Sequence, residues 1–288
     1  MRMPSPPPTS DAQPFLTKRE LVIQPRPGWI AIDWRELWDS RELLLFLVLR
    51  DVKVRYKQTV LGVLWAALQP LFTMLIFTVI FGRFAKIPSE GFPYAIFVFA
   101  GLLPWTLFAN AVTQASQSLI SQQALLTKIY LPRLFVPGAA IGGGLVDLAI
   151  SSIVFLGIMF YYSVVPGWGF LAVPLLVLLT SAAALGVGLS LAALTVTYRD
   201  FRYVVPFMIQ SWLYISPVIY PVSVVPAKWQ WALALNPMAG IIDAFRSALL
   251  GLPWNLTTLG VSSASSIAIL VFGLFYFRKT ERRFADVA

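Results

Sequence analysis

The sequence predicts an all-α integral membrane protein. Its expected parts are six transmembrane helices, an N-terminal interfacial amphipathic helix, and a re-entrant helical hairpin between spans five and six. Of the 288 residues, 58% are hydrophobic and only 12% are charged, against about 25% charged residues in a soluble domain. Several apolar runs reach the roughly 20 residues that a helix needs to cross a bilayer. The basic residues gather in the segments between alternate runs.

The composition excludes several classes of site. The chain has neither Cys nor His, so it lacks thiolate metal ligands, disulfides and the commonest general base. No catalytic residues and no metal site are expected. A GxxxxGK[ST] phosphate-binding loop is absent from the sequence, so the chain is not expected to hydrolyse ATP by itself. The net charge of +9 is interpreted through membrane topology, and no nucleic-acid partner is expected.

Two segments precede the first span. Residues 1–33 begin Pro- and Ser-rich and are expected to form a disordered cytoplasmic tail, without a signal peptide. Residues 34–57 read WRELWDSRELLLFLVLRDVKVRYK and mix Trp and Leu with Arg and Lys. This pattern favours an amphipathic helix lying in the membrane interface. A cytoplasmic helix packed on another subunit is the alternative.

Residues 58–277 are expected to form the transmembrane domain. Its six predicted spans cover residues 60–81, 94–112, 134–165, 170–197, 203–220 and 256–277.

A further apolar segment, residues 229–250, is interrupted by Asn236-Pro237 and carries Asp243 and Arg246. A spanning helix would expose these charges and the freed backbone groups to lipid. We therefore expect residues 221–255 to form a re-entrant segment.

The distribution of Lys and Arg supports this topology. The inside segments 1–59, 113–133, 198–202 and 278–288 hold 10, 2, 2 and 4 basic residues, and the outside segments hold only Arg83, Lys86, Lys228 and Arg246. A seventh span would place the basic tail 278–288 outside, against the positive-inside rule. Both termini are therefore expected in the cytoplasm.

Two cytoplasmic turns are candidate docking points. Residues 113–133 are too long for a simple helical hairpin. Within them, residues 114–126 (QASQSLISQQALL) are expected to form a short helix that projects into the cytoplasm and ends before Pro132. Residues 197–203 (TYRDFRY) form a tight charged turn. That turn is either a second docking point or an ordinary polar turn.

Some residues inside the spans are unusual for their position. Asp147 is the lone carboxylate well inside a span, and either a function or structural hydrogen bonding would explain it. Gly138 and Gly142 form a GxxxG pair, and a ladder of small residues passes through Gly186. Such faces let helices approach closely, and packing within one subunit is the expected use.

Five motifs follow one another along the chain. They are RDVKVRYKQTVLGVLWAALQPL, GLLPWTLFANAV, LLTKIYLPRLFVP, YRDFRY with the following SPVIYP, and LNPMAGIIDAFRSALLG. In this order and spacing, over about residues 40–288, the chain resembles the transmembrane permease subunit of type-2 ATP-binding-cassette exporters. The similar branch exports O-antigen, capsular polysaccharide and teichoic acid.

The resemblance implies a homodimer in a bacterial inner (plasma) membrane, with two copies of a separate nucleotide-binding ATPase subunit that carries ATP and Mg. It implies ATP-driven export of a polysaccharide linked to an undecaprenyl diphosphate carrier. It also implies that the two cytoplasmic turns couple to the ATPase. The coupling residues would be Leu126, Thr127, Lys128, Ile129, Tyr130, Pro132, Arg133, Arg199 and Asp200.

The implied channel is lined mainly by spans one and five. Aromatic faces stack on the apolar faces of sugar rings, so the candidate lining residues are Trp65, Phe72, Trp212 and Tyr214, with lipid-facing or core positions as the alternative. Arg55 and Lys57 are candidates for contact with the carrier diphosphate. A role as topology anchors explains these two charges equally well.

Three other functions fit the sequence less well. An exporter of a drug or small lipid belongs to the same superfamily but fits the motif spacing less closely. An integral membrane enzyme that modifies lipids or sugars would need catalytic acids or a His. A proton-coupled carrier would need more charges within its spans.

Overall fold

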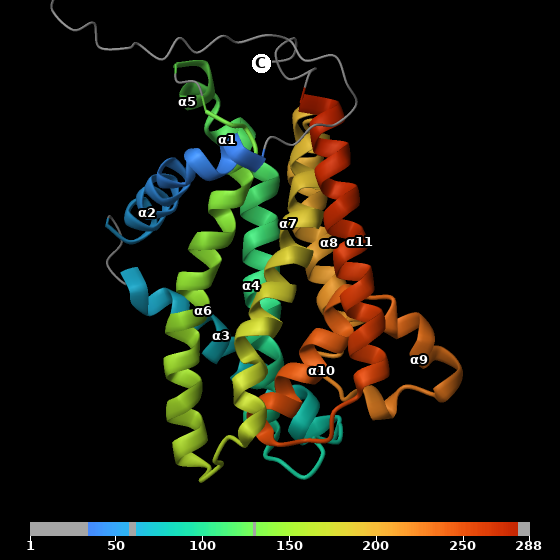
Figure 1. The fold of residues 1–288 in the computed structure, drawn as a ribbon. Coiled ribbons are helices and arrows are strands. Elements are labelled where there is room, and N and C mark those ends of the chain that lie inside the picture. Colours follow the sequence, from blue (N-terminus) through green and yellow to red (C-terminus); the bar gives the residue numbers. More distant parts are fainter. Residues whose placement is uncertain (1–33, 58–61, 129–130, 282–288) are drawn as a thin grey trace, which may run out of the picture. The chain divides into compact units, whose positions relative to one another are not determined.

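The computed structural model describes residues 34–57, 62–128 and 131–281, and every regular element within them is a helix (Figure 1). The expected N-terminal tail lies outside the described residues, as do Ile129, Tyr130 and most of the expected C-terminal tail.

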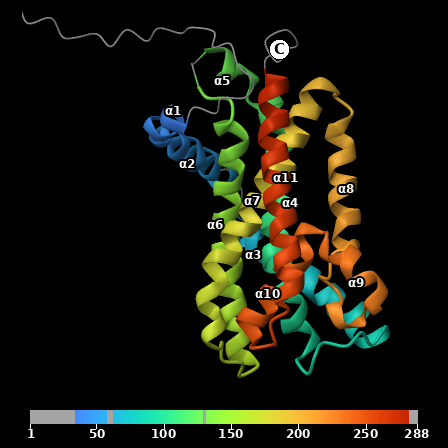
Figure 2. The ribbon, with the colours of Figure 1, turned by 45° about the vertical axis from the view of Figure 1, so that its right-hand side comes forward.

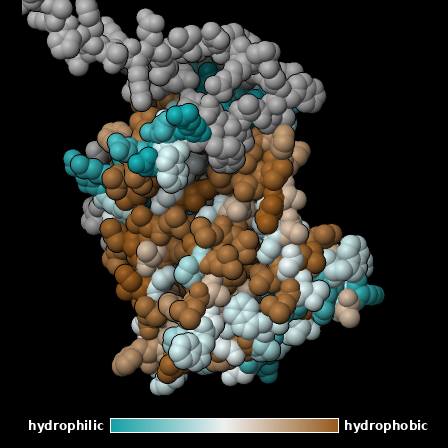
Figure 3. All heavy atoms as spheres, viewed as in Figure 1, coloured by the Kyte–Doolittle hydropathy of each residue, from teal (hydrophilic) through white to brown (hydrophobic). Residues whose placement is uncertain are grey.

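Five helical segments in the described part of the chain are long and apolar enough to cross a bilayer. They are α3 Gly62–Phe77 with the π-helix η1 Thr78–Phe84, α4 Tyr94–Ser121, α6 Phe135–Tyr161, the 3-10 helix η2 Trp168–Ala172 with α7 Val173–Thr197, and α11 Leu256–Glu281. Figure 3 shows apolar side chains over the middle of this bundle, with hydrophilic residues on α1–α2 and near α9.

The expected fifth span is shorter than predicted. Its helix, α8 Phe201–Ile215, has 15 residues, or about 22 Å at 1.5 Å per residue. A proline disfavours helical geometry at the residue before it, and Ser216, which precedes Pro217, has extended backbone angles. The predicted span 203–220 therefore ends its helix five residues early. The chain then passes through a short turn, η3 Val222–Val224.

Two helices follow with a sharp bend between them. α9 Ala227–Ala234 and α10 Pro237–Leu250 meet at 103°. The Asn236 side chain caps α10 by accepting from the Met238 N–H, and Pro237 suits the first helical position. Figures 1 and 2 place both helices at the end of the bundle that holds η1. A broken span and a re-entrant loop share such a bend, so re-entry into the membrane stays a prediction.

Residues 34–57, predicted to be one interfacial helix, form two helices, α1 Trp34–Asp39 and α2 Arg41–Lys57, and their place in the membrane interface stays a prediction. α2 packs along α6. A Cβ on Gly142 would lie 2.5 Å from Val48, and one on Gly138 would lie 3.8 Å from Leu44. The GxxxG pair thus serves contact within one subunit, as predicted, with α2 as its partner. On its other side α2 exposes apolar residues, namely Leu45, Phe46 and Leu49.

α4 lies at the centre of the bundle. Most of its apolar window is buried, whereas the other four candidate spans bury a third or less of theirs. α4 packs against α3, α6, α7, α8 and α10. The outer helices therefore cover α4 with one face and leave their other faces for lipid or another protein.

The buried side chain of Arg246 joins three parts of this bundle. It is 1% exposed, and it donates to the carbonyl oxygens of Phe97 (3.2 Å), Pro217 (2.7 Å) and Val218 (2.6 Å). Its guanidinium carbon lies 3.7 Å from the centroid of the Phe97 ring. Gly101 makes room, because a Cβ there would lie 2.7 Å from Nη2 of Arg246. The structure therefore buries Arg246 in protein, where the sequence analysis counted it among the outside charges.

We expect Arg246→Leu to unfold the chain or to lower its melting temperature strongly, because it strands three buried carbonyl oxygens at about 1–3 kcal/mol each. Arg246→Lys should retain part of the stability, since it keeps the charge but loses the planar fork of donors. Thermal unfolding in mild detergent measures both. Equal melting temperatures for the wild type and Arg246→Leu would contradict this role.

The crossing of α7 and α11 depends on glycine. A Cβ on Gly186 would lie 2.5 Å from the Leu270 backbone nitrogen, and one on Gly273 would collide with the Gly186 carbonyl oxygen. We expect Gly273→Ala to destabilise the chain by about 1–3 kcal/mol through overpacking. Gly260→Ala, on the same helix with nothing within 4 Å, should be neutral or stabilising. Melting temperatures of the two variants test this, and the reverse order would exclude a tight crossing.

Candidate functional site

Arg55 forms a polar cluster where the end of α2 meets α4 and α6. Its Nη1 lies 2.7 Å from a carboxylate oxygen of Asp147, and its Nη2 donates to Gln114. The Tyr56 hydroxyl donates to the other Asp147 oxygen. Asp147 therefore has a basic partner on α2, which precedes all the spans. Structural hydrogen bonding of Asp147 is confirmed, and a further function for it stays open.

Tyr56 remains a hydrogen-bond donor at neutral pH. Burial, reinforced by the bond to Asp147, raises the pKa of Tyr56 to about 12. A raised pKa means that the neutral phenol persists well above physiological pH. Tyr56 and Arg55 thus both donate to one carboxylate.

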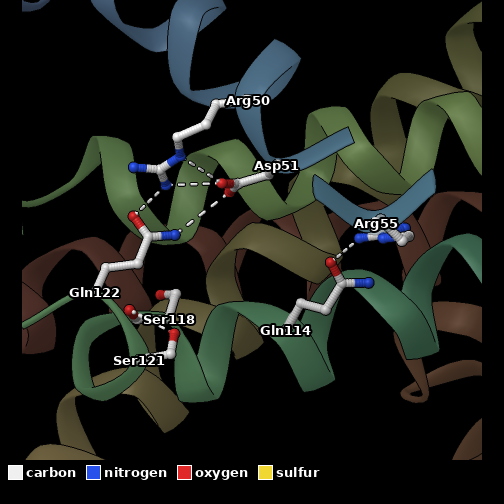
Figure 4. Close-up of polar contacts among 7 residues, drawn as sticks. All are labelled: Arg50, Asp51, Arg55, Gln114, Ser118, Ser121 and Gln122. Carbon is white, nitrogen blue, oxygen red and sulfur yellow. Dashed lines mark hydrogen bonds and ion pairs between the residues drawn. The ribbon is translucent and has the colours of Figure 1, made fainter. Parts of the chain in front are cut away.

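A second cluster contains Gln122, eight residues after Gln114 of the first cluster. Arg50 donates through Nη2 to Asp51 and to Gln122, both at 2.7 Å. Gln122 returns a longer bond of 3.4 Å to Asp51. Figure 4 shows these three side chains converging, with the Arg55–Gln114 bond beside them. Because Gln122 caps α4 just before α5 Gln123–Lys128, this cluster ties α2 to the start of the first docking turn.

The first docking turn differs from the prediction. Residues 114–121 continue α4, and only Gln123–Lys128 form a separate short helix. The hydroxyls of Ser116, Ser118 and Ser121 donate to carbonyl oxygens three residues earlier. These bonds satisfy the hydroxyls within the helix, so the polar sequence extends α4 rather than starting a new element.

Few of the predicted coupling side chains are described. Those of residues 126–130 lie outside the described part of the chain, although α5 itself ends at Lys128. Pro132 is partly buried just before α6. Arg133 donates to the Glu281 carbonyl oxygen at 2.8 Å, a favourable place for a cation because helix C-termini carry partial negative charge.

The second docking turn is exposed. Arg199 and Asp200 are exposed between α7 and α8, and Asp200 directly precedes α8. Figure 2 shows this turn at the same end of the bundle as α5 and the last turns of α11. The structure thus brings the two predicted docking turns to one end of the bundle, and their role in coupling stays a prediction.

The four predicted channel aromatics differ in exposure. Trp65, Phe72 and Tyr214 are each more than half exposed. Trp212 is partly buried. Its Nε1 donates to Asn236 at 3.1 Å, and its ring meets Phe108 edge-on at 5.2 Å. Trp212 thus ties α8 to the bend before α10. Lining of a channel stays a prediction for all four.

Two cavities flank the Arg55 cluster. The first, of about 610 Å³, lies between α2, α3, α4 and α6. Its lining residues are Arg55, Tyr56, Gly62, Trp65, Ala66, Gln69, Pro70, Thr106, Asn110, Gln114, Asp147 and Ser151. The second, of about 580 Å³, lies between α2 and the ends of α4 and α5, and it also touches Arg55 and Gln114. These two side chains therefore line both cavities. Lys57, the other candidate for the carrier diphosphate, is exposed and is not among the lining residues of either cavity.

The sequence analysis missed Tyr56, Gln114 and Gln122. The sequence did contain a signal for Gln114. Thr106, Asn110 and Gln114 recur every four residues in a mostly apolar run, which places them on one helix face. For Tyr56 and Gln122 the partners come from other helices, and no pattern within one segment indicates them.

Residues 42–250 match the family of ABC-2 type transporters. The chain belongs to this family. It is 32% identical over 215 residues to the O-antigen export system permease protein RfbA of Myxococcus xanthus, across 74% of this chain and 82% of that protein. An RfbA permease of Klebsiella pneumoniae is 27% identical over 250 residues, 85% of this chain and 95% of the relative.

The polysialic acid transport protein KpsM of Escherichia coli is 24% identical over 243 residues, 82% of this chain and 92% of the relative. The family and the apolar helices together make this ABC-2 family member a multi-pass membrane protein. The family match begins in α2 and ends with α10, so it includes the Arg55 cluster, both docking turns and Arg246.

We expect the Arg55–Asp147 pair to be strongly coupled. Arg55→Gln and Asp147→Asn should each lower the free energy of unfolding. The double variant should lose less unfolding free energy than the two single variants together, and the difference, the coupling energy, should be about 0.5–3 kcal/mol. Arg278 and Glu281, paired at 2.9 Å within α11 with similar exposure, give a control cycle. Its coupling should be only about 0.2–0.5 kcal/mol. Additive effects at Arg55 and Asp147 would show that the pair contributes nothing specific.

Proposed function

We propose that this chain is the channel-forming membrane subunit of an ATP-driven exporter that carries a lipid-linked polysaccharide out of the cytoplasm across a bacterial inner membrane. The observation that carries the proposal is the likeness, over most of the chain, to permeases named for O-antigen and polysialic acid export. The chain would act without catalytic residues of its own.

The energy would come from a separate ATPase. The sequence has no phosphate-binding loop, so ATP and Mg would bind two copies of a partner subunit, each docked on one chain of a homodimer. Two features support docking at the α5 end: the exposed turn at Arg199 and Asp200, and the separate short helix α5. Both termini would lie on this cytoplasmic side.

The motion of the ATPase would reach α2 through hydrogen bonds. A displacement of α5 pulls on Gln122, which bonds to Arg50 beside Asp51 on α2. α2 also carries Arg55 and Lys57, the predicted contacts of an undecaprenyl diphosphate carrier. Lys57 is exposed and open to a phosphate oxygen, whereas a diphosphate at Arg55 would first have to displace Asp147. The proposal therefore gives Lys57 the first contact with the carrier.

One comparison favours a second candidate. The inner membrane transport permease YadH of Escherichia coli is 28% identical over 196 residues, 64% of this chain and 75% of the relative. Its name specifies no polysaccharide. An exporter of a drug or small lipid built on the same family fold is therefore the alternative function.

Co-purification with the products of neighbouring genes tests the proposal. A tagged chain in mild detergent should retain a stoichiometric ATPase, and Lys128→Ala combined with Ile129→Ala should reduce that ATPase at least tenfold by removing contacts of the docking turn. Arg133 is left unchanged because it bonds the end of α11. The matched control is Lys228→Ala, an exposed lysine within α9, and α9 lies away from the α5 end of the bundle (Figure 1).

A gene deletion identifies the class of substrate in cells. Deletion of the gene should trap lipid-linked polysaccharide in the cytoplasm, and the wild-type gene should restore its export. Normal export without the gene, with loss of resistance to a drug or of a small lipid outside, would favour the alternative. A chain that acts on lipid-linked sugars while no ATPase co-purifies under any condition would overturn the permease proposal.

A further inference from the structure

The cavity beside Arg55, defined by the first lining set above, has the dimensions of a ligand site. Its volume of about 610 Å³ lies within the roughly 300–1,000 Å³ typical of small-molecule pockets. It opens between α3, α4 and α6 and ends at the tip of α2.

Its polar lining comes from the spanning helices themselves. Thr106, Asn110 and Gln114 form one stripe along α4, and Asp147 and Ser151 form another along α6. Polar side chains within membrane spans are costly and usually face a functional cavity. Both stripes face this one.

Two amide side chains of the lining, Gln69 on α3 and Asn110 on α4, are accessible from the cavity. The side chains of Thr106 and Ser151 donate to backbone carbonyls. Among the described residues, by contrast, neither Asn110 nor Gln69 makes a side-chain hydrogen bond. Gln69 is exposed and Asn110 is half-buried, and each primary amide offers two donors and an acceptor to a ligand in the cavity. A ligand with several hydroxyl groups would satisfy both amides at once.

The charges in the lining cancel. Arg55 pairs with Asp147 at 2.7 Å and also donates to Gln114, so its positive charge is already compensated. An anionic ligand at this place would break that pair and face the Asp147 carboxylate. The electrostatics therefore favour an uncharged ligand.

An aromatic residue completes the lining. Trp65 of α3 is 56% exposed and lines the cavity. A tryptophan offers a large, flat apolar surface with one N–H donor. A pyranose ring has the matching properties, since its C–H face is apolar and its edge carries hydroxyls.

We propose that this cavity binds an uncharged sugar ring of the transported glycan, with the ring on Trp65 and its hydroxyls bonded to Asn110 and Gln69. This inference rests on the proposed function and specifies its substrate contact. The sugar would lie within the chain, beside the paired Arg55, while the charged carrier group stays outside the cavity at Lys57.

Direct binding to the purified chain in lipid nanodiscs tests this site without the ATPase. The probes are the methyl glycosides of glucose, galactose, mannose and rhamnose, detected by saturation-transfer NMR, with inorganic diphosphate as the anionic probe. We expect at least one glycoside to bind, and Asn110→Leu and Trp65→Ala each to weaken it at least tenfold. Trp229→Ala is the matched control, since Trp229 on α9 is also 56% exposed but lies outside the cavity.

The outcomes separate this inference from the function it rests on. Loss of glycoside binding in the two cavity variants, with wild-type melting temperatures and unchanged binding in Trp229→Ala, supports the site. Absence of glycoside binding to folded wild type, or binding that survives both variants, overturns it. Diphosphate binding that depends on Arg55 but not on Asn110 overturns it in favour of an anion site. An ATPase that co-purifies with a chain unable to bind glycosides leaves the exporter standing and removes only the sugar site.

Discussion

The guanidinium of Arg246 is the interaction on which the irregular part of the bundle depends. Between α8 and η3 the backbone leaves helical geometry, so its carbonyl oxygens need partners that a membrane cannot supply. Arg246 supplies them from α10 while resting on Phe97 of α4. Pro217 ends α8, and the buried cation of Arg246 then satisfies the carbonyl oxygens that follow, holds α10 on α4, and leaves no room for a side chain at Gly101. Asn236 accepts a hydrogen bond from Trp212 at the bend and thereby joins α8 to the start of α10.

A second set of polar contacts is formed by α2, at Arg50 and Arg55. Arg55 and Arg50 lie five residues apart on one helix, and each joins a carboxylate to a glutamine of α4. These bonds connect a helix outside the spans to the central helix at two levels. The proposed docking turn and the proposed sugar cavity are therefore neighbours along α4, separated by only two turns. The proposed sugar binding and the proposed movement of the docking turn would therefore both act on the contacts between α2 and α4, through Gln114 and Gln122.

The sequence was sufficient for the features that depend on one segment at a time. Apolar run length predicted four of the helices near their observed positions, and Asn236-Pro237 predicted the bend. Prediction from the sequence failed where the structure of a segment depends on residues outside it. Residues 114–121 look like a new helix, yet their serines bond within α4. Span five looks long enough, yet Pro217 ends it. Asp147 had no visible partner because Arg55 lies 92 residues earlier.

The length of α4 has a mechanical consequence. Its 28 residues extend about 42 Å, whereas the hydrocarbon core of a bilayer is about 30 Å thick. α4 therefore exceeds the hydrocarbon thickness by about two turns, and it leads directly into Gln122 and its bond to α2. A force applied at α5 would act on the end of α4, which packs against five other helices. A tilt of α4 would therefore act directly on the helices that pack against it, namely α3, α6, α7, α8 and α10.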